Sequence, residues 1–177
     1  MHAYALDEFG DTGSRPAEWV DIGSSSWQLD DVRLSVPAVR LEPLELTGPK
    51  NRKKVTKENV LQIWVRIKNV GVTRKIDYRG WSVAAGEAAP RLTDPAGKVL
   101  PAKRFDPGWE PPGRPQTITL FPGRSVLQLL VFEAPSSATD QFRLELPGAA
   151  FGSSETVRLL VPRSTINSRP PPLPNAP

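Results

Sequence analysis

Hydrophobic and polar positions alternate most strictly over residues 60–71, which read Val-Leu-Gln-Ile-Trp-Val-Arg-Ile-Lys-Asn-Val-Gly. Within this run the aliphatic side chains of Leu61, Ile63, Val65 and Ile67 take every second position. A period of two is that of a β-strand with one buried face, whereas a helix would scatter these side chains around its circumference. We therefore predict a strand here and expect the rest of the chain to cover its buried face.

Shorter stretches with the same alternation follow one another along the chain, closed by Pro or Gly. They lie at residues 32–36, 75–83, 90–101, 116–120, 126–135, 141–147 and 156–162. Turn signals recur about every 8–12 residues, which is typical of two-sheet sandwiches. The pattern predicts a single all-β antiparallel sandwich of about seven to nine strands. Its core candidates are Leu61, Ile63, Val65, Ile67, Leu129, Val131, Leu144 and Leu146.

Proline residues mark where the ladder is interrupted. Pro37 and Pro43 lack the N–H that a central strand donates, so the first strand must lie at a sheet edge or continue after a bulge. Residues 48–59 are polar and predict a hairpin loop on the surface. Residues 101–115 are too rich in proline for a regular ladder and predict a long loop pinned by Phe105 and Trp109.

Composition limits the number of domains. The chain has 177 residues, of which 38% are hydrophobic and 24% charged, which is enough for one core. We divide it into an acidic linker or docked arm (1–29), the sandwich (30–162) and a proline-rich tail (163–177). No apolar run approaches the ~18–20 residues that span a bilayer, and residues 1–5 lack the features of a signal peptide. We expect no membrane insertion by this chain; an export signal or anchor would lie upstream of Met1.

Charge is distributed unevenly. Residues 1–31 carry a net charge of −6 and the remainder carries +10. We expect the arm to fold back through Trp19 or Trp27 onto Trp64 or the loop at residues 50–57, with Trp27 docking near the first strand, since burial of an indole adds to weak surface ion pairs. The alternative is that the arm is only a tether.

Five stretches carry a resemblance to a known family: residues 61–71, 77–82, 92–98, 120–125 and 129–135. They resemble bacterial immunoglobulin-like domains of unknown function, related to secreted antigen-type sandwiches. The positions that match the family pattern are Asn69 and Gly71, Asp94 and Gly97, Pro122 and Gly123, and Phe132 and Pro135. The resemblance covers residues 30–162. It implies an immunoglobulin-like β-sandwich with flexible tails, in an extracytoplasmic, envelope-associated protein.

The sequence contains few residues that could serve in catalysis or hold a metal. His2 is the only histidine and cysteine is absent, so a nucleophile–histidine pair or a zinc site cannot be assembled within the domain. The adjacent carboxylates of Asp30 and Asp31 point to opposite faces if the chain is extended there. Neither a dense calcium loop nor a phosphate-binding glycine motif occurs. We expect no enzyme activity, no metal and no cofactor.

The remaining functional candidates are charged and aromatic residues on the surface. The candidate interaction surface comprises Lys50, Arg52, Lys53, Lys54, Lys57, Trp64 and Trp109. If the basic loop folds near Arg74, Lys75 and Arg79, the local field would favour an anionic partner, although basic hairpin tips also serve simply as solvated edges. Trp64 lies opposite the aliphatic stripe and either packs under a neighbouring segment or marks a binding patch.

Two functions follow from these observations. The first is a non-catalytic interaction or structural module with a protein partner. The alternative is a binder of an anionic polymer, nucleic acid or acidic glycan, through the basic loop. Nucleic-acid binding would also favour aromatic residues among the charges, and the loop itself has none.

Overall fold

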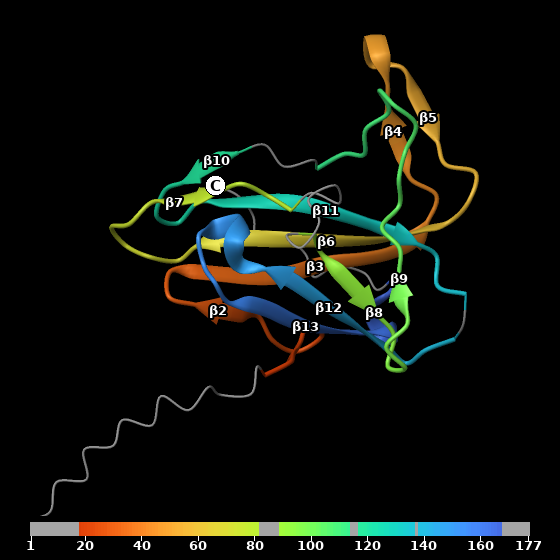
Figure 1. Ribbon diagram of the computed structural model, residues 1–177. Coiled ribbons are helices and arrows are strands. Elements are labelled where there is room, and N and C mark those ends of the chain that lie inside the picture. Colours follow the sequence, from red (N-terminus) through yellow and green to blue (C-terminus); the bar gives the residue numbers. More distant parts are fainter. Residues whose placement is uncertain (1–17, 82–88, 114–116, 137, 168–177) are drawn as a thin grey trace, which may run out of the picture.

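Two β-sheets packed face to face form the sandwich in the computed structural model, which describes residues 18–81, 89–113, 117–136 and 138–167 (Figure 1). The five-stranded sheet has the order β1 (Val20–Asp21), β13 (Thr156–Pro162), β12 (Gln141–Pro147), β8 (Arg91–Thr93) and β9 (Val99–Leu100). The four-stranded sheet has the order β11 (Ser125–Glu133), β6 (Val60–Asn69), β3 (Val32–Glu42) and β2 (Trp27–Leu29). Strand β1 is parallel to β13, and the other neighbours in these sheets are antiparallel. The predicted all-β sandwich is confirmed.

Two short two-stranded sheets lie at opposite ends of the sandwich (Figure 1). One pairs β7 (Ile76–Tyr78) with β10 (Ile118–Leu120), and the other pairs β4 (Glu45–Thr47) with β5 (Lys53–Val55). The described helices are the short 3-10 turns η1 (Pro49–Asn51), η3 (Gly148–Phe151) and η4 (Arg163–Thr165). Within the described ranges, no helix is long and apolar enough to cross a membrane.

Strand β6 is the central element that its alternation predicts. It pairs with β3 on one side and β11 on the other. Its side chains at Leu61, Ile63, Val65 and Ile67 are fully buried in the main core. Residues of β12 and β13 on the facing sheet complete that core, including Leu144 and Leu146.

Strand β11 corrects the predicted core. Leu129 and Val131 are buried, but they point to the outer face of the four-stranded sheet and belong to a separate cluster there. The inward positions are Leu130 and Phe132, with Leu130 paired to Ile63 of β6. Because the run is apolar on both faces, alternation could not show which face is inward, and a change of one residue reverses the assignment.

Strand β3 continues through Pro37 as one eleven-residue strand. Its register against β6 shifts between Ser35 and Ala38, so the proline sits in a bulge. The bulge, one of the two alternatives that the sequence allowed, is therefore present, and β2 pairs with β3 only from Val32 to Leu34, so that it ends before Pro37.

Both terminal segments of the described chain lie along strand edges. Trp27 begins β2 beside β3, and the ring of Trp19 lies 5.6 Å from the guanidinium carbon of Arg143 on β12. At the other end, Ile166 bridges Val39 of β3, and the side-chain oxygen of Asn167 accepts a hydrogen bond from Leu41 N–H at 3.0 Å. These contacts cover backbone edges that could otherwise pair with another chain.

The arm thus docks Trp27 beside the first long strand, β3, as expected, but it does not reach the other landing surface that was expected for it. Residues 18–29 lie beside β13, β12 and β3, whereas the expected landing surface, Trp64 and the loop at residues 50–57, is occupied by the segment at residues 101–113. Residues 1–17 of the arm and 168–177 of the tail lie outside the described residues.

Candidate interaction surface

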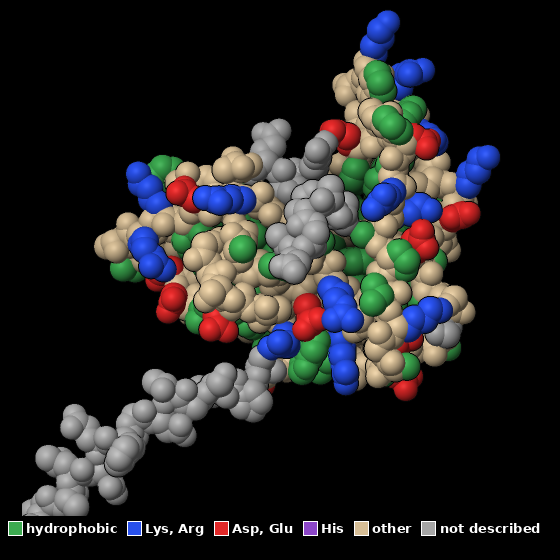
Figure 2. Space-filling model, in the orientation of Figure 1, with side chains coloured by type: hydrophobic (Ala, Val, Ile, Leu, Met, Phe, Trp, Pro, Cys, Tyr) green, Lys and Arg blue, Asp and Glu red, His purple; other side chains and the backbone are tan. Residues whose placement is uncertain are grey.

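The hairpin formed by β4, η1 and β5 projects from one end of the sandwich, and basic side chains lie at its tip (Figures 1 and 2). We call it the projecting hairpin. Its turn is closed by a hydrogen bond from Gly48 N–H to Arg52 O at 2.8 Å. Lys50 and Asn51 adopt positive φ angles of 56° and 62° in this turn. Left-handed backbone is uncommon for lysine, so the tip holds a defined conformation that presents Lys50 to solvent.

The loop at residues 101–113 runs beside the projecting hairpin. Thr47 and Glu110 exchange two backbone hydrogen bonds of 2.9 Å, as neighbouring strands do. The ring of Trp109 lies so close to Gly48 that a Cβ there would come within 2.8 Å of it. A glycine is therefore required at this position for the indole to lie against the hairpin backbone.

A second hydrophobic cluster braces the hairpin against the sandwich. Its buried members are Leu44, Leu46, Val60, Leu129 and Val131, with Trp64, Phe105 and Trp109 packed against them. The cluster lies on the outer face of the four-stranded sheet, between that sheet, the hairpin and the loop. Phe105 and Trp109 thus anchor the loop, as the sequence predicted.

The charged side chains of the hairpin gather around Trp109. The guanidinium carbon of Arg52 lies 5.9 Å and the Nζ of Lys54 lies 5.3 Å from the ring centroid. Both distances are in the range of cation–π attraction. Lys54 Nζ also lies 2.9 Å from a carboxylate oxygen of Asp106. The hydrogen bond and the charge of Lys54 lower the pKa of Asp106 below its ordinary value.

The predicted interaction residues do not all share this surface. Lys53 forms an ion pair with Glu45 at 3.1 Å, whereas Lys50 and Lys57 are exposed and form no ion pair among the residues that the structure describes. Trp64 is half-buried in the second hydrophobic cluster, beneath Gly113, where a Cβ would come within 2.7 Å of its ring. Trp64 therefore packs under a neighbouring segment, which is the loop rather than the arm.

Arg74 and Lys75, which precede β7, do not join the hairpin, whereas Arg79, which follows β7, lines the same cavity as Trp109. The hairpin precedes the start of β6, and Arg74 and Lys75 follow its end. Ten residues of strand separate these two ends by about 30 Å. Arg74 instead pairs with Asp31 at 3.2 Å, and Lys75 lies over the ring of Phe121.

Sequence reasoning grouped Trp109 with the basic residues as one candidate surface, but it did not show that the indole ring contacts Arg52 and Lys54. The hairpin has no aromatic residue of its own, and the indole that lies among its charges comes from a loop about fifty residues later in the sequence. The Pro and Gly residues around Trp109 indicated an ordered loop, but not its neighbour.

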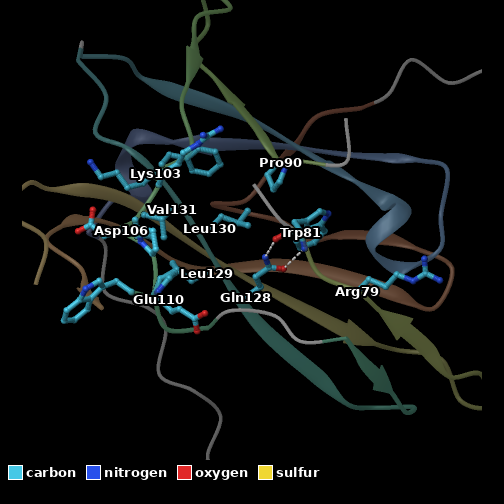
Figure 3. Close-up of a pocket in the computed structure, with 17 residues that line it drawn as sticks. Arg79, Trp81, Pro90, Lys103, Asp106, Glu110, Gln128, Leu129, Leu130 and Val131 are labelled. Carbon is cyan, nitrogen blue, oxygen red and sulfur yellow. Dashed lines mark hydrogen bonds between the residues drawn. The ribbon is translucent and has the colours of Figure 1, made fainter. Parts of the chain in front are cut away.

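A cavity of about 690 Å³ opens between this loop and β11 (Figure 3). Lys103, Asp106 and Glu110 lie toward one end, and Trp81 and Gln128 lie toward the other. The Trp81 end is an internal support of the fold, because the buried Gln128 amide accepts from Trp81 N–H at 3.1 Å and donates to Trp81 O at 2.7 Å. Among the described residues, no three His, Cys, Asp or Glu side chains are placed to hold a metal.

Buried polar groups hold the opposite end of the sandwich. The amide of Asn69 donates to Arg74 O at 2.7 Å and to Leu120 O at 2.9 Å, and accepts from Gly71 N–H at 2.9 Å. The hydroxyl of Tyr78 donates to Gln128 Oε1, and burial raises the pKa of Tyr78 far above its ordinary value. These groups fasten β7 and β10 to the sandwich and leave the projecting hairpin as the candidate surface.

Comparison with known proteins supports the fold. No protein-family model and no curated protein sequence matches the chain. Among solved structures, the yjhA protein of Bacillus subtilis matches with a TM-score of 0.50 and 17% identity, over 80% of this chain and 98% of that one.

Two further bacterial structures are similar at lower scores. The ycdA protein of Bacillus subtilis has a TM-score of 0.48 and 16% identity, over 78% of this chain and 38% of that one. The secreted protein MPT63 of Mycobacterium tuberculosis has a TM-score of 0.45 and 11% identity, over 82% and 98%. The chain shares an all-β fold with bacterial proteins such as yjhA.

Proposed function

We propose that the protein is a non-catalytic interaction module that binds a protein partner through the projecting hairpin. The observation that carries the proposal is the bracing of an exposed hairpin by its own hydrophobic cluster. A surface that is held rigid before binding loses less conformational entropy when a partner docks. Trp109 and Arg52 are also of the residue types that dominate binding energy at interfaces.

The partner is expected to present an acidic surface. Lys50, Arg52 and Lys57 are exposed on the hairpin, and Val55 of β5 is 56% exposed beside them. The valine, which pairs across the hairpin with Glu45, offers apolar contact near these basic residues. Interfaces commonly combine apolar contact with a polar surround.

Placement in the bacterial envelope is part of the proposal and rests on the sequence resemblance to envelope-associated immunoglobulin-like domains. Fractionation of cells that express the natural gene from its own promoter tests this placement. Recovery of the protein only with cytoplasmic markers would contradict it.

A second candidate function is binding of an anionic polymer at the same hairpin. The observation that favours it is Trp109, whose ring lies beside Arg52 and Lys54. An aromatic face among cations is the arrangement that stacks a base or sugar while charge holds the backbone.

Site-specific photo-crosslinking tests the proposal. A photoreactive residue at Val55 is expected to yield a discrete protein adduct from bacterial envelope extract, and Val99 of β9, 48% exposed, is the matched control. The adduct should be lost in a Lys50→Gln/Lys57→Gln variant. Equal adducts at both positions would refute the protein-binding proposal. Loss of the adduct on addition of polyphosphate, together with direct polyphosphate binding at the hairpin, would favour the second candidate.

A further inference from the structure

The outer face of the four-stranded sheet carries a second basic surface, distinct from the projecting hairpin. Alternate residues of a strand point to one face, and those opposite the core on β3 and β6 include Arg33, Arg40, Arg66 and Lys68. Arg33 and Lys68 are exposed, and Arg40 and Arg66 are half-buried. We call these four residues the cationic strip.

The register places like charges directly opposite each other. Arg33 of β3 pairs with Lys68 of β6, and Arg66 is the next outward residue along β6. Directly opposed like charges destabilise an antiparallel pair. Such a violation of a local rule is expected where a residue serves binding rather than folding.

No acidic side chain neutralises the strip within the part of the chain that the structure describes. Arg33 donates from Nε at 3.0 Å and from Nη2 at 2.8 Å to Oε1 of Gln28, which is a neutral acceptor. This contact orients the guanidinium and leaves its charge in place. By contrast, Arg91 and Arg158 on the outer face of the other sheet both pair with Glu145.

The shape of the face selects an elongated ligand. Arg33, Lys68 and Arg66 lie at one end of the face, and the half-buried Arg40 of β3, in the row of Gln62, lies about 20 Å from Lys68. Toward the start of β6, the second hydrophobic cluster and Gly113 over Trp64 cover the same face. A flat membrane surface would meet these covering segments first, whereas a linear chain can lie along the open part.

We infer that the cationic strip binds a linear phosphodiester polymer. Guanidinium groups match phosphate oxygens with paired hydrogen bonds, and three of the four basic residues are arginines. A tetrahedral phosphate can accept from Arg33 and Lys68 together, since its oxygens point in different directions. A phosphodiester polymer carries its anions in the backbone itself, whereas the carboxylates of an acidic peptide lie on flexible side chains that must be ordered on binding. Ligand binding thus relieves the repulsion that the free protein contains.

Binding of the full chain to a fluorescent oligothymidylate, measured over a range of salt concentrations, tests the inference. Each phosphate contact on a single strand contributes about −0.7 to the slope of log K against log salt, so four contacts predict a slope of about −3. Inorganic polyphosphate should compete. Polyglutamate of similar charge and vesicles of phosphatidylglycerol should compete weakly.

Two double variants distinguish binding at the cationic strip from an effect of net charge alone. Arg66→Gln/Lys68→Gln is expected to reduce the slope to about −1.4 by removing two contacts. Arg91→Gln/Arg158→Gln removes the same charge from the opposite sheet and should leave the slope unchanged. Equal losses in both variants, or competition by polyglutamate or vesicles as strong as that by polyphosphate, would overturn the inference.

The melting temperature distinguishes a binding role of Lys68 from a role in holding the fold. Lys68→Gln is expected to raise the melting temperature of the free protein, because it removes the opposed charge, while weakening binding. A lowered melting temperature would show that Lys68 supports the fold and would count against the inference. Loss of oligothymidylate binding in Lys50→Gln/Lys57→Gln alone would assign it to the hairpin instead. The crosslinking result at Val55 does not depend on any of these outcomes.

Discussion

Gln128 is the buried polar residue whose replacement should reveal most about how the fold is held. Its side chain, only 1% exposed, joins β11 to the end of β7. Oε1 accepts from the Tyr78 hydroxyl and from Trp81 N–H, and Nε2 donates to Trp81 O. A Gln128→Leu variant keeps a similar volume but leaves these three groups without that partner.

The magnitude follows from the number of groups left unsatisfied. A buried donor or acceptor that loses its partner destabilises the folded state by about 1–3 kcal/mol. Three such groups around Gln128 predict a loss of about 3–9 kcal/mol, a large fraction of the 5–15 kcal/mol typical of a domain. Gln62→Leu is the matched control, because Gln62 is 4% exposed but forms one hydrogen bond, to Glu42 O at 3.2 Å. Its expected loss is about 1 kcal/mol.

Urea denaturation followed by tryptophan fluorescence measures both variants. The midpoint should fall much further for Gln128→Leu than for Gln62→Leu, with a similar slope for both. Adding Tyr78→Phe to Gln128→Leu should cost less than the sum of the two single losses, because the hydroxyl that lost its acceptor is gone. If Gln128→Leu costs no more than Gln62→Leu, the reasoning from unsatisfied groups is refuted.

Three further predictions concern single groups. Gly113→Ala should lower the free energy of unfolding by about 2–3 kcal/mol, because of left-handed strain and contact with Trp64. The control is Gly97→Ala in the β8–β9 turn, where a Cβ meets nothing within 4 Å, and it should lower that free energy by only about 1 kcal/mol. Equal losses in urea denaturation would contradict this reasoning. Because burial raises the pKa of Tyr78, the folded state holds the phenol proton more tightly than the unfolded state does. The contribution of this group to folding stability is therefore complete at neutral pH and declines as pH rises above the unfolded-state pKa of about 10. Its tyrosinate absorbance, obtained by difference from Tyr78→Phe, should therefore grow only with unfolding, and ionisation in the folded protein would contradict burial. Because Lys54 lowers the pKa of Asp106, the ion pair should persist until pH falls through that lowered pKa. Lys54→Met should raise the midpoint of the NMR titration of the Asp106 carboxyl. An unchanged midpoint would show that Lys54 does not lower this pKa.

The local features of this fold could be predicted from the sequence because neighbours along the chain specify them. The period of two over β6 predicted which of its side chains face the main core, and Leu61, Ile63, Val65 and Ile67 are all at 0% exposure there. The Asp94–Gly97 turn was also predictable, since Gly97 has a φ of +84° and its N–H bonds Asp94 O at 2.9 Å. In both cases the physical signal lies within a few residues.

Features that depend on pairing between distant segments were decided only by the tertiary structure. The run in β11 is apolar on both faces, so only its register against β6 shows that Leu130 points inward. The contact of Trp109 with Arg52, and the opposition of Arg33 and Lys68, join residues that no local period relates. Both candidate surfaces therefore arise from strand register and loop packing, which the sequence encodes through the whole fold rather than through any single stretch.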